Sequence, residues 1–283
     1  MSFKFKQIYL NGCSFMWGMG HSNPNTFKFF EETKDIDTSH PVYYNGKTPF
    51  NNYDWVRQKF NIGGRLKEHY GINVIDESIY GGSLQRAVRK TMNWMLNNSD
   101  SIKDTLFILE WPIGIRREIY IELQKRYVNY TANFDNYDNI DPYIHRVLIN
   151  EFAPNFFASD IAFLEDLHSL IGVVSYIKQN GGEYLILLDE FPIEQLNETT
   201  TKYVGEHKIK NVVNTLILPN TITFTYGDKS NIKSLLEYYR DYEKATITND
   251  TNSVEIDEHN SIRGSRLIAE QIIKNITSIY EKY

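Results

Sequence analysis

Short apolar runs alternate with amphipathic helical stretches along this chain, and that alternation limits the folds that it can adopt. Five strands are predicted, at residues 7–10, 72–75, 105–109, 184–188 and 221–225. Helices are predicted at residues 53–70, 84–96, 160–179 and 261–280. Such alternation is typical of a parallel sheet covered by helices on both faces, and the unbroken apolar run at residues 105–109 fits a strand buried on both sides. The sequence therefore predicts an α/β fold with a five-stranded parallel sheet.

The remaining segments are interpreted as turns and insertions. Gly71 and the pair Gly181-Gly182 are expected to end helices, and Gly63-Gly64 to interrupt one imperfectly. Residues 21–52 are rich in Asn, Asp, Thr and Pro, and residues 112–157 mix polar and aromatic side chains. The sequence shows no internal repeat and no clear linker. We therefore expect one domain over residues 1–283, with insertions at about 21–52 and 112–157.

The composition narrows the classes of protein and partner. The chain has 283 residues, of which 41% are hydrophobic and 23% charged, as in globular proteins. Its formal net charge is -6 and it has no Lys/Arg-rich block, which disfavours nucleic acid and anionic membranes as partners. The N-terminus lacks the apolar core of a secretory signal, and no stretch reaches the ~18 apolar residues that cross a bilayer. A cytoplasmic protein is expected, and a lone Cys13 excludes an internal disulfide.

Four segments carry residues that can do chemistry. Three follow predicted strands, at residues 11–15, 80–83 and 110–118, and the fourth, residues 257–259, directly precedes the last helix. In an open parallel sheet, function collects at the carboxyl ends of the strands. We therefore expect these segments to meet at that edge.

Ser14 has two interpretations. On a tight turn between a strand and a helix its hydroxyl would project above the sheet edge, and its own N–H could stabilise an oxyanion. Alternatively, Ser14 is an ordinary helix N-cap. A nucleophile needs a base, and Asp257 and His259 supply one, because an imidazole accepts the hydroxyl proton while a carboxylate orients the ring. Glu255 or Glu258 could replace Asp257, and an Asp-x-His before a helix can equally be a solvated cap.

Other kinds of site have less support. Gly81-Gly82-Ser83 could offer a backbone N–H to an oxyanion, since glycine lets the backbone approach a ligand. The sequence has no His-x-x-x-His or Cys pair for a metal, no phosphate loop and no dinucleotide fingerprint. The G-x-S-x-G elbow is also absent, since Met16 stands where its second glycine would be. No metal or cofactor is expected.

Taken together, these blocks resemble the SGNH, or GDSL-type, serine hydrolase superfamily, and especially a branch whose first block reads Gly-Cys-Ser-Phe. The matching blocks are Asn11-Gly12-Cys13-Ser14-Phe15 continued by Trp17-Gly18, then Gly81-Gly82-Ser83, and finally Asp257 and His259. The resemblance implies Ser14 as nucleophile, His259 as base and Asp257 as its orienting acid. It implies the N–H groups of Ser14 and Gly81 as oxyanion donors. It also implies a flavodoxin-like three-layer α/β/α sandwich.

The third block departs from the family pattern. The family usually has Gly-x-Asn after the third strand, whereas this chain has Glu110-Trp111-Pro112-Ile113-Gly114-Ile115-Arg116-Arg117-Glu118, which is similar to a Trp-x-x-x-x-Arg-x-Glu variant of the Gly-Cys-Ser branch. Pro112 offers neither a side-chain amide nor an N–H near the position of the missing Asn. Arg116 is the candidate replacement donor, or else it pairs with Glu118 or lies at the surface. Trp17, Trp111 and Arg116 are the candidate substrate contacts.

The resulting hypothesis is ester hydrolysis or acyl transfer through an acyl-Ser14 intermediate. A small acyl group such as acetyl on a carbohydrate is the favoured substrate, by family analogy. The 20 Tyr and 16 Phe residues fit either a carbohydrate groove or a packed core. The alternative is a binding or structural module that keeps the fold without the chemistry, which Pro112 and the polar insertion at 112–157 would suit. No oligomeric state is predicted.

Overall fold

The computed structural model describes residues 3–13, 16, 32, 34–37, 42–45, 48–51, 54–79, 82–111, 116–122, 125–131, 143, 146, 160–189, 221–224 and 262–280. Contacts group the chain into two compact units. One unit comprises Lys4–Cys13 and Ile75–Phe224, and the other comprises Met1–Phe3, Ser14–Val74 and Thr225–Tyr283. The single domain over residues 1–283 stays a prediction.

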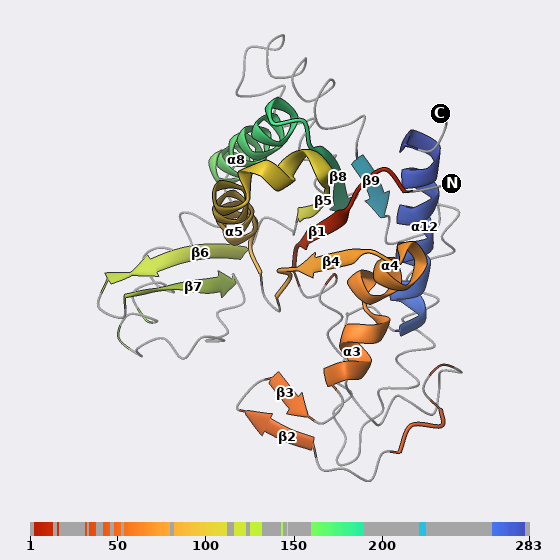
Figure 1. The fold of residues 1–283 in the computed structure, drawn as a ribbon. Coiled ribbons are helices and arrows are strands. Elements are labelled where there is room, and N and C mark those ends of the chain that lie inside the picture. The colour runs from red at the N-terminus through yellow and green to blue at the C-terminus, as the bar shows by residue number, and fades with distance from the viewer. Residues whose placement is uncertain are drawn as a thin grey trace. The chain divides into compact units, whose positions relative to one another are not determined.

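A parallel sheet forms the centre of the first unit (Figure 1). The strands β1 (Gln7–Asn11), β5 (Thr105–Trp111), β8 (Glu183–Asp189) and β9 (Thr221–Phe224) pair in parallel, each with the next. The strand β4 (Asn73–Asp76) gives the order β4-β1-β5-β8-β9. A parallel register therefore joins four strands rather than the predicted five, and the fifth, β4, is a short edge strand whose residues are exposed or half-buried.

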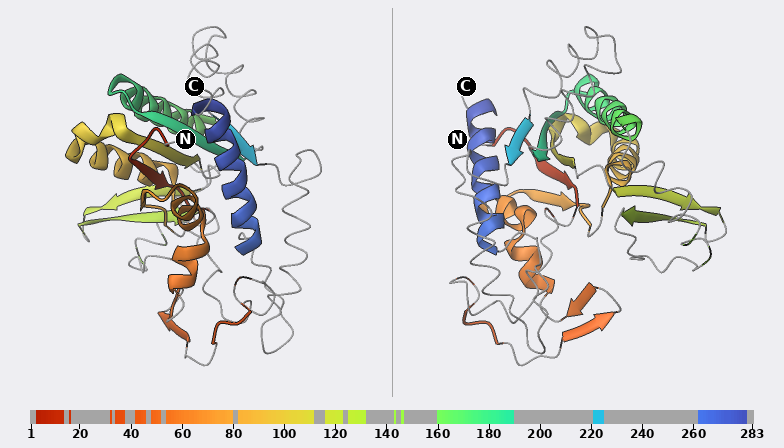
Figure 2. Two further views of the ribbon diagram at one scale, coloured as in Figure 1. Left: turned by 45° about the vertical axis from the view of Figure 1, so that its right-hand side comes forward. Right: turned by 180° about the vertical axis from the view of Figure 1, so that it is seen from behind.

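Two helices pack on one face of this sheet (Figures 1 and 2). These are α5 (Leu84–Asn97) and α8 (Asp160–Gln179), both of which were predicted, and they contact each other as well as the sheet. Ser83 caps α5 by accepting the N–H of Arg86 at 3.2 Å. A short 3-10 helix, η1 (Ser99–Asp104), leads into β5.

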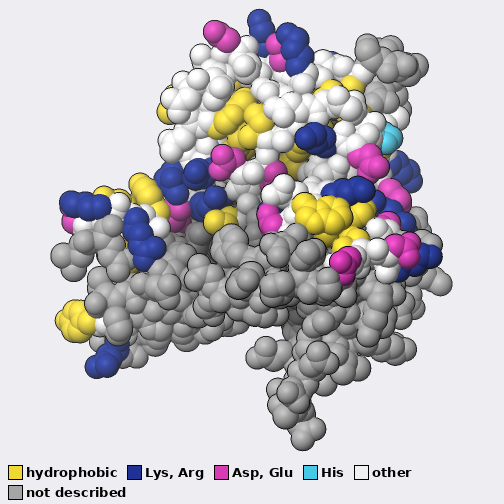
Figure 3. All heavy atoms as spheres, turned by 60° about the horizontal axis from the view of Figure 1, so that its bottom comes forward, with side chains coloured by type: hydrophobic (Ala, Val, Ile, Leu, Met, Phe, Trp, Pro, Cys, Tyr) yellow, Lys and Arg dark blue, Asp and Glu magenta, His cyan; other side chains and the backbone are white. Residues whose placement is uncertain are grey.

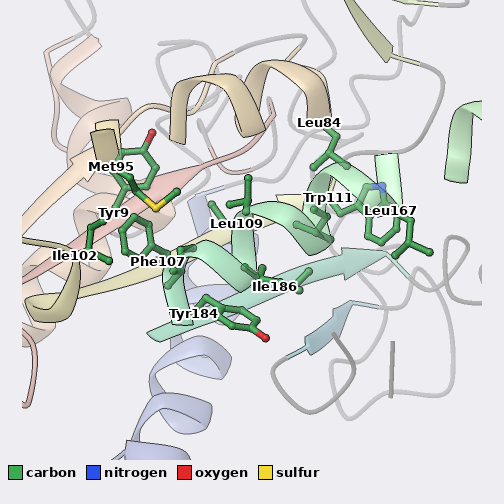
Figure 4. Close-up of a cluster of buried hydrophobic side chains, with 14 residues drawn as sticks. Tyr9, Leu84, Met95, Ile102, Phe107, Leu109, Trp111, Leu167, Tyr184 and Ile186 are labelled. Atoms are coloured by element: carbon green, nitrogen blue, oxygen red, sulfur yellow. The ribbon is translucent and has the colours of Figure 1, made fainter. Parts of the chain in front are cut away.

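The main hydrophobic core lies between these helices and the sheet (Figure 4). From the strands it includes Tyr9, Phe107, Leu109, Tyr184 and Ile186. The alternate strand residues, Ile8, Leu10, Leu106, Ile108 and Leu185, are also fully buried. Burying one such side chain typically contributes about 1.5–3 kcal/mol. The strand predicted at residues 105–109 is thus buried on both faces, which confirms the reading of its unbroken apolar run.

A hairpin in the predicted insertion at 112–157 was missed by the sequence analysis. The strands β6 (Arg116–Ile121) and β7 (Arg126–Thr131) pair antiparallel, with Tyr120 opposite Tyr127. Their turn includes Lys125 at a φ of 50°. Charged residues occupy half of β6, namely Arg116, Arg117 and Glu118, so the usual apolar alternation of a strand is weak.

The second unit contains three helices that contact one another. These are α3 (Asp54–Phe60), α4 (Ile62–Tyr70) and α12 (Ile262–Tyr280). The last was predicted from its apolar stripe, of which Ile268, Ile272 and Ile276 are buried. Residues 21–52, predicted as loop, contain a second hairpin of β2 (Val42–Asn45) and β3 (Thr48–Asn51).

The helix predicted over residues 53–70 is in fact two helices. The break falls at Asn61, not at Gly63-Gly64, because the Asn61 side chain caps α4 by accepting the N–H of Gly64 at 2.7 Å. Gly71 ends α4 as predicted, with a φ of 64° and its N–H donated to Lys67.

Charges of both signs mix on the described surface. On the face shown in Figure 3, Lys and Arg side chains lie among Asp and Glu side chains. Exposed pairs include Lys6–Asp104 at 2.7 Å and Lys178–Glu183 at 2.6 Å, and such pairs typically contribute less than about 1 kcal/mol. Among the residues that the structure describes, no helix has the length and apolar character needed to cross a membrane.

Candidate active site

The carboxyl end of β1 is anchored by a buried asparagine. Asn11 is fully buried, and its amide nitrogen donates to Ala87 O at 3.0 Å, Thr91 Oγ1 at 3.2 Å and Tyr9 OH at 3.3 Å. Arg86 donates to Asn11 Oδ1 at 3.4 Å. Burial raises the pKa of Tyr9 to about 12, which keeps its hydroxyl neutral. This network ties Asn11, the last residue of β1, to α5, directly before Gly12 and Cys13.

A carboxylate from β5 contacts the two residues that follow Asn11. Glu110 Oε2 accepts the backbone N–H of Cys13 at 2.7 Å, and Glu110 Oε1 accepts its thiol at 3.0 Å. Glu110 also lies against Gly12, where an added Cβ would come within 2.3 Å of Oε2 and 2.7 Å of the Glu110 Cβ. Gly12 is therefore needed for close approach, not only for turning the chain.

The residues that follow β4 contact Leu10 and Gly12 from the side of β1 opposite β5. The N–H groups of Glu77 and Ile79, just beyond β4, donate to Leu10 O at 2.9 Å and to Gly12 O at 3.2 Å. A Cβ added to Gly82 would lie 2.8 Å from Gly12 O. The structure thus brings together described residues from three of the four segments that the sequence singles out.

The meeting point has the topology of a ligand site. In the order β4-β1-β5, the strand next in the chain after β1 is β4, on one side of it, and the following strand, β5, lies on its other side. The direction in which strands are added to the sheet therefore reverses at β1. Ligands of open parallel sheets bind outside the carboxyl ends of the strands at such a reversal. Gly12 and Glu110 lie at this position. Each directly follows one member of the Asn11–Leu109 pair, the last pair between β1 and β5.

Alanine at Gly12 is expected to destabilise the fold by about 1–3 kcal/mol, because Glu110 or the turn must move to admit a methyl group. Urea unfolding measures the effect. Gly172→Ala in α8 is the matched control, since a Cβ there meets nothing within 4 Å and alanine favours a helix by up to about 1 kcal/mol. A Gly12→Ala variant as stable as the native chain would contradict the close approach.

Ion pairs attach the β6–β7 hairpin to the helices. Arg89 of α5 binds both carboxylate oxygens of Glu118, at 2.7 and 2.6 Å, and lies 4.0 Å over the Tyr127 ring. Arg117 binds Asp166 of α8 at 2.7 Å. The partner of Glu118 that the structure describes is thus Arg89. The backbone of Arg116 is in β6 opposite Thr131, and its side chain lies outside the description, so its oxyanion and substrate roles stay predictions.

Trp111, a predicted substrate contact, is packed in the hydrophobic core and is 1% exposed (Figure 4). The neighbours of Trp111 in the core indicate a packing role, and its role as a substrate contact stays a prediction. The other predicted site residues lie outside the described residues, namely Ser14, Trp17, Gly81, Pro112, Asp257 and His259.

No role was predicted from the sequence for Asn11 or Glu110. A polar residue ending an apolar strand was the available signal for Asn11, whereas nothing local marks Glu110 as a partner of Cys13. Among the described residues, no three His, Cys, Asp or Glu side chains are grouped so as to hold a metal ion.

Comparison with known proteins gives distant structural likenesses. No family model matches the sequence, and no curated protein matches it. A family two carbohydrate esterase from Clostridium thermocellum in complex with cellohexaose matches with 10% identity and a TM-score of 0.45, over 98% of this chain and 65% of that one. An acetyl xylan esterase from Butyrivibrio proteoclasticus matches with 8% identity and a TM-score of 0.44, over 96% and 64%.

A third similar structure is a lipolytic protein of the G-D-S-L family from Desulfitobacterium hafniense DCB-2. It matches with 10% identity and a TM-score of 0.41, over 95% of this chain and 98% of that one. This chain spans about two thirds of the length of the carbohydrate esterases that it matches. These similar solved structures are thus two carbohydrate esterases and one G-D-S-L lipolytic protein, each at 10% identity or less.

Proposed function

We propose that the chain is a serine ester hydrolase whose nucleophile is Ser14. The observation that carries the proposal is the close contact of Gly12 with Glu110 and with Gly82, at the reversal point of the sheet. These residues belong to three of the four blocks that resemble the SGNH superfamily. Two of them are glycines whose missing side chains make the contact possible, so the blocks are adjacent for a steric reason.

The proposed reaction has two half-steps. Ser14 Oγ attacks the ester carbonyl carbon while its proton passes to His259, which Asp257 orients. The C–O bond to the alcohol then breaks, and the alcohol leaves with the proton from His259. Water, deprotonated by His259, attacks the acyl-Ser14 carbonyl and releases the carboxylic acid and the serine.

The oxyanion donors in this proposal are those that the sequence resemblance implies. By that resemblance the N–H groups of Ser14 and Gly81 bind the oxyanion. The Cys13 N–H does not compete for this role, because Glu110 accepts it. Pro112 leaves the place of the family's third donor without an amide, and Arg116 is its proposed replacement. One lost donor typically costs about 100–1,000-fold in rate.

The finer fold assignment belongs to the same proposal. Numbered along the chain, the strands of the sheet lie in the order 2-1-3-4-5, which is that of doubly wound flavodoxin-like folds. We therefore propose a flavodoxin-like three-layer sandwich forming one domain. For the substrate we propose a small acyl ester, such as acetyl on a carbohydrate, on the sequence resemblance and the many aromatic residues.

Covalent labelling tests the proposal without knowledge of the substrate. A fluorophosphonate should react with the folded chain and leave one adduct, which peptide mass spectrometry should place on Ser14. The Ser14→Ala variant and the urea-unfolded chain are the controls, and neither should be labelled. A folded chain that gives no adduct would overturn the hydrolase assignment.

Absence of the adduct would instead favour a binding module that keeps the fold without the chemistry. The observation behind this second candidate is Pro112, which removes a donor that catalysis in this family normally uses. Retained carbohydrate binding by an unlabelled, folded chain would support it.

A further inference from the structure

The Glu110 carboxylate holds two donors of one residue at once. Cys13 donates its backbone N–H to Oε2 at 2.7 Å and its thiol to Oε1 at 3.0 Å, and Cys13 is only 1% exposed. Two such bonds to one planar carboxylate fix both the peptide plane and the side-chain torsion of Cys13.

The turn is fixed from two sides. Glu110 fills the space beside the Gly12 Cα, while Ile79 N–H binds Gly12 O and Gly82 lies against the same carbonyl. Before it, Asn11 is tied to α5 by its buried amide. The three residues that precede Ser14 are thus each held by a specific contact from another part of the same unit.

We infer that Glu110 is a positioning residue, whose carboxylate, by holding the N–H and S–H of Cys13, sets the orientation of the next residue, Ser14. The inference rests on the proposed nucleophilic role of Ser14. Rates of attack are sensitive to such placement, because a shift of about 1 Å can cost roughly 100-fold. This role also explains why a cysteine suits position 13, since a thiol is small and apolar enough for a buried site yet donates a hydrogen bond.

Paired substitutions separate the two hydrogen bonds. Cys13→Ala removes only the side-chain donor, and the fluorophosphonate labelling rate of Ser14 should fall about tenfold, the worth of one hydrogen bond. Cys13→Ser keeps a donor and should recover most of that rate. Glu110→Gln keeps one acceptor oxygen and replaces the other with an NH2 group, so only one of the two Cys13 donors keeps its partner. The labelling rate should again fall about tenfold. Glu110→Ala loses both acceptors and should lose about 100-fold.

The matched control is Asp104→Asn, at the other end of the β5 segment, where a carboxylate pairs with the exposed Lys6. It makes the same change of charge and should label at the native rate. With an aryl acetate, the Cys13 and Glu110 variants should lower kcat while KM stays within about twofold, because positioning of the nucleophile and not substrate binding is lost. Thermal unfolding identifies any variant that fails to fold, and Cys13→Ala and Glu110→Gln, the smallest changes, then decide.

The outcomes separate the two proposals. If the native chain labels at Ser14 while folded Glu110→Gln and Cys13→Ala label at the native rate, the positioning role is wrong and the hydrolase proposal stands. If the folded native chain gives no adduct, both fall together. Loss of labelling in Cys13→Ala with recovery in Cys13→Ser supports the inference, because a general loss of stability would not be repaired by one hydroxyl.

Discussion

Alanine in place of His259 is expected to lower kcat/KM for p-nitrophenyl acetate by roughly 1,000,000-fold, and Ser14→Ala by a similar factor. Both expectations follow from the proposed reaction, in which the imidazole removes the serine proton and neither group works without the other. The remaining rate would come from the oxyanion donors and from substrate binding. Steady-state kinetics on variants with native thermal unfolding measure the effect.

The double variant is the sharper measurement. If Ser14 and His259 act as one unit, the Ser14→Ala/His259→Ala chain should be no slower than either single variant, whereas independent losses would multiply to roughly a trillionfold. Multiplied losses would contradict the shared mechanism. Asp257→Asn should cost roughly 1,000–10,000-fold. If Asp257→Asn keeps its activity while Glu255→Gln or Glu258→Gln loses a comparable factor, the residue whose substitution lowers the activity is the one that orients His259.

The sheet and its helices could be predicted because each carries its own periodic signal. Strands buried on both faces are short apolar runs, as at residues 105–109, and α8 lies where its apolar stripe placed it. The two hairpins could not be predicted in this way. In β6, the positions that would be apolar in an ordinary strand include Arg117, which is buried against Asp166 from a helix 49 residues further on.

The candidate site could be predicted in outline but not in its contacts. Strand order brings the blocks after β1, β4 and β5 to one edge, and the sequence indicates that much. The role of Glu110 depends on a residue 97 positions earlier, so local pattern carries no trace of it. Gly12 reads as a turn residue, although the steric demand on it comes from Glu110.

Methionine in place of Arg117 is expected to lower the free energy of unfolding by about 3–5 kcal/mol at pH 8. Arg117 is 5% exposed and Asp166 1%, and their ion pair spans 2.7 Å. Gln85 also donates to the same oxygen of Asp166, at 2.6 Å, whereas Asp166 Oδ2 has no partner in the described structure. Removing Arg117 would leave a buried carboxylate with one neutral donor and no opposite charge beside it.

The loss should shrink at pH 5, and the sign follows from the pKa of Asp166. Burial raises that pKa to about 6 from an ordinary value of 3.8, while Arg117 and Gln85 oppose the rise. A folded-state pKa above the unfolded one means that the folded chain binds more protons, so this group favours folding at low pH and loses roughly 3 kcal/mol as pH rises through about 4 to 6. Without Arg117 the pKa rises further, and at pH 5 the carboxyl is neutral.

Urea unfolding of Arg117→Met at pH 5 and pH 8 therefore separates charge from packing. In an Asp166→Asn background no carboxylate is left to charge, so the same Arg117→Met change should cost a similar amount at both pH values. An equal loss at both pH values in the native background would show that packing of the Arg117 stem, and not the buried charge, holds the β6–β7 hairpin to α8. A loss confined to pH 8 would identify Asp166 as the group whose ionisation makes Arg117 necessary.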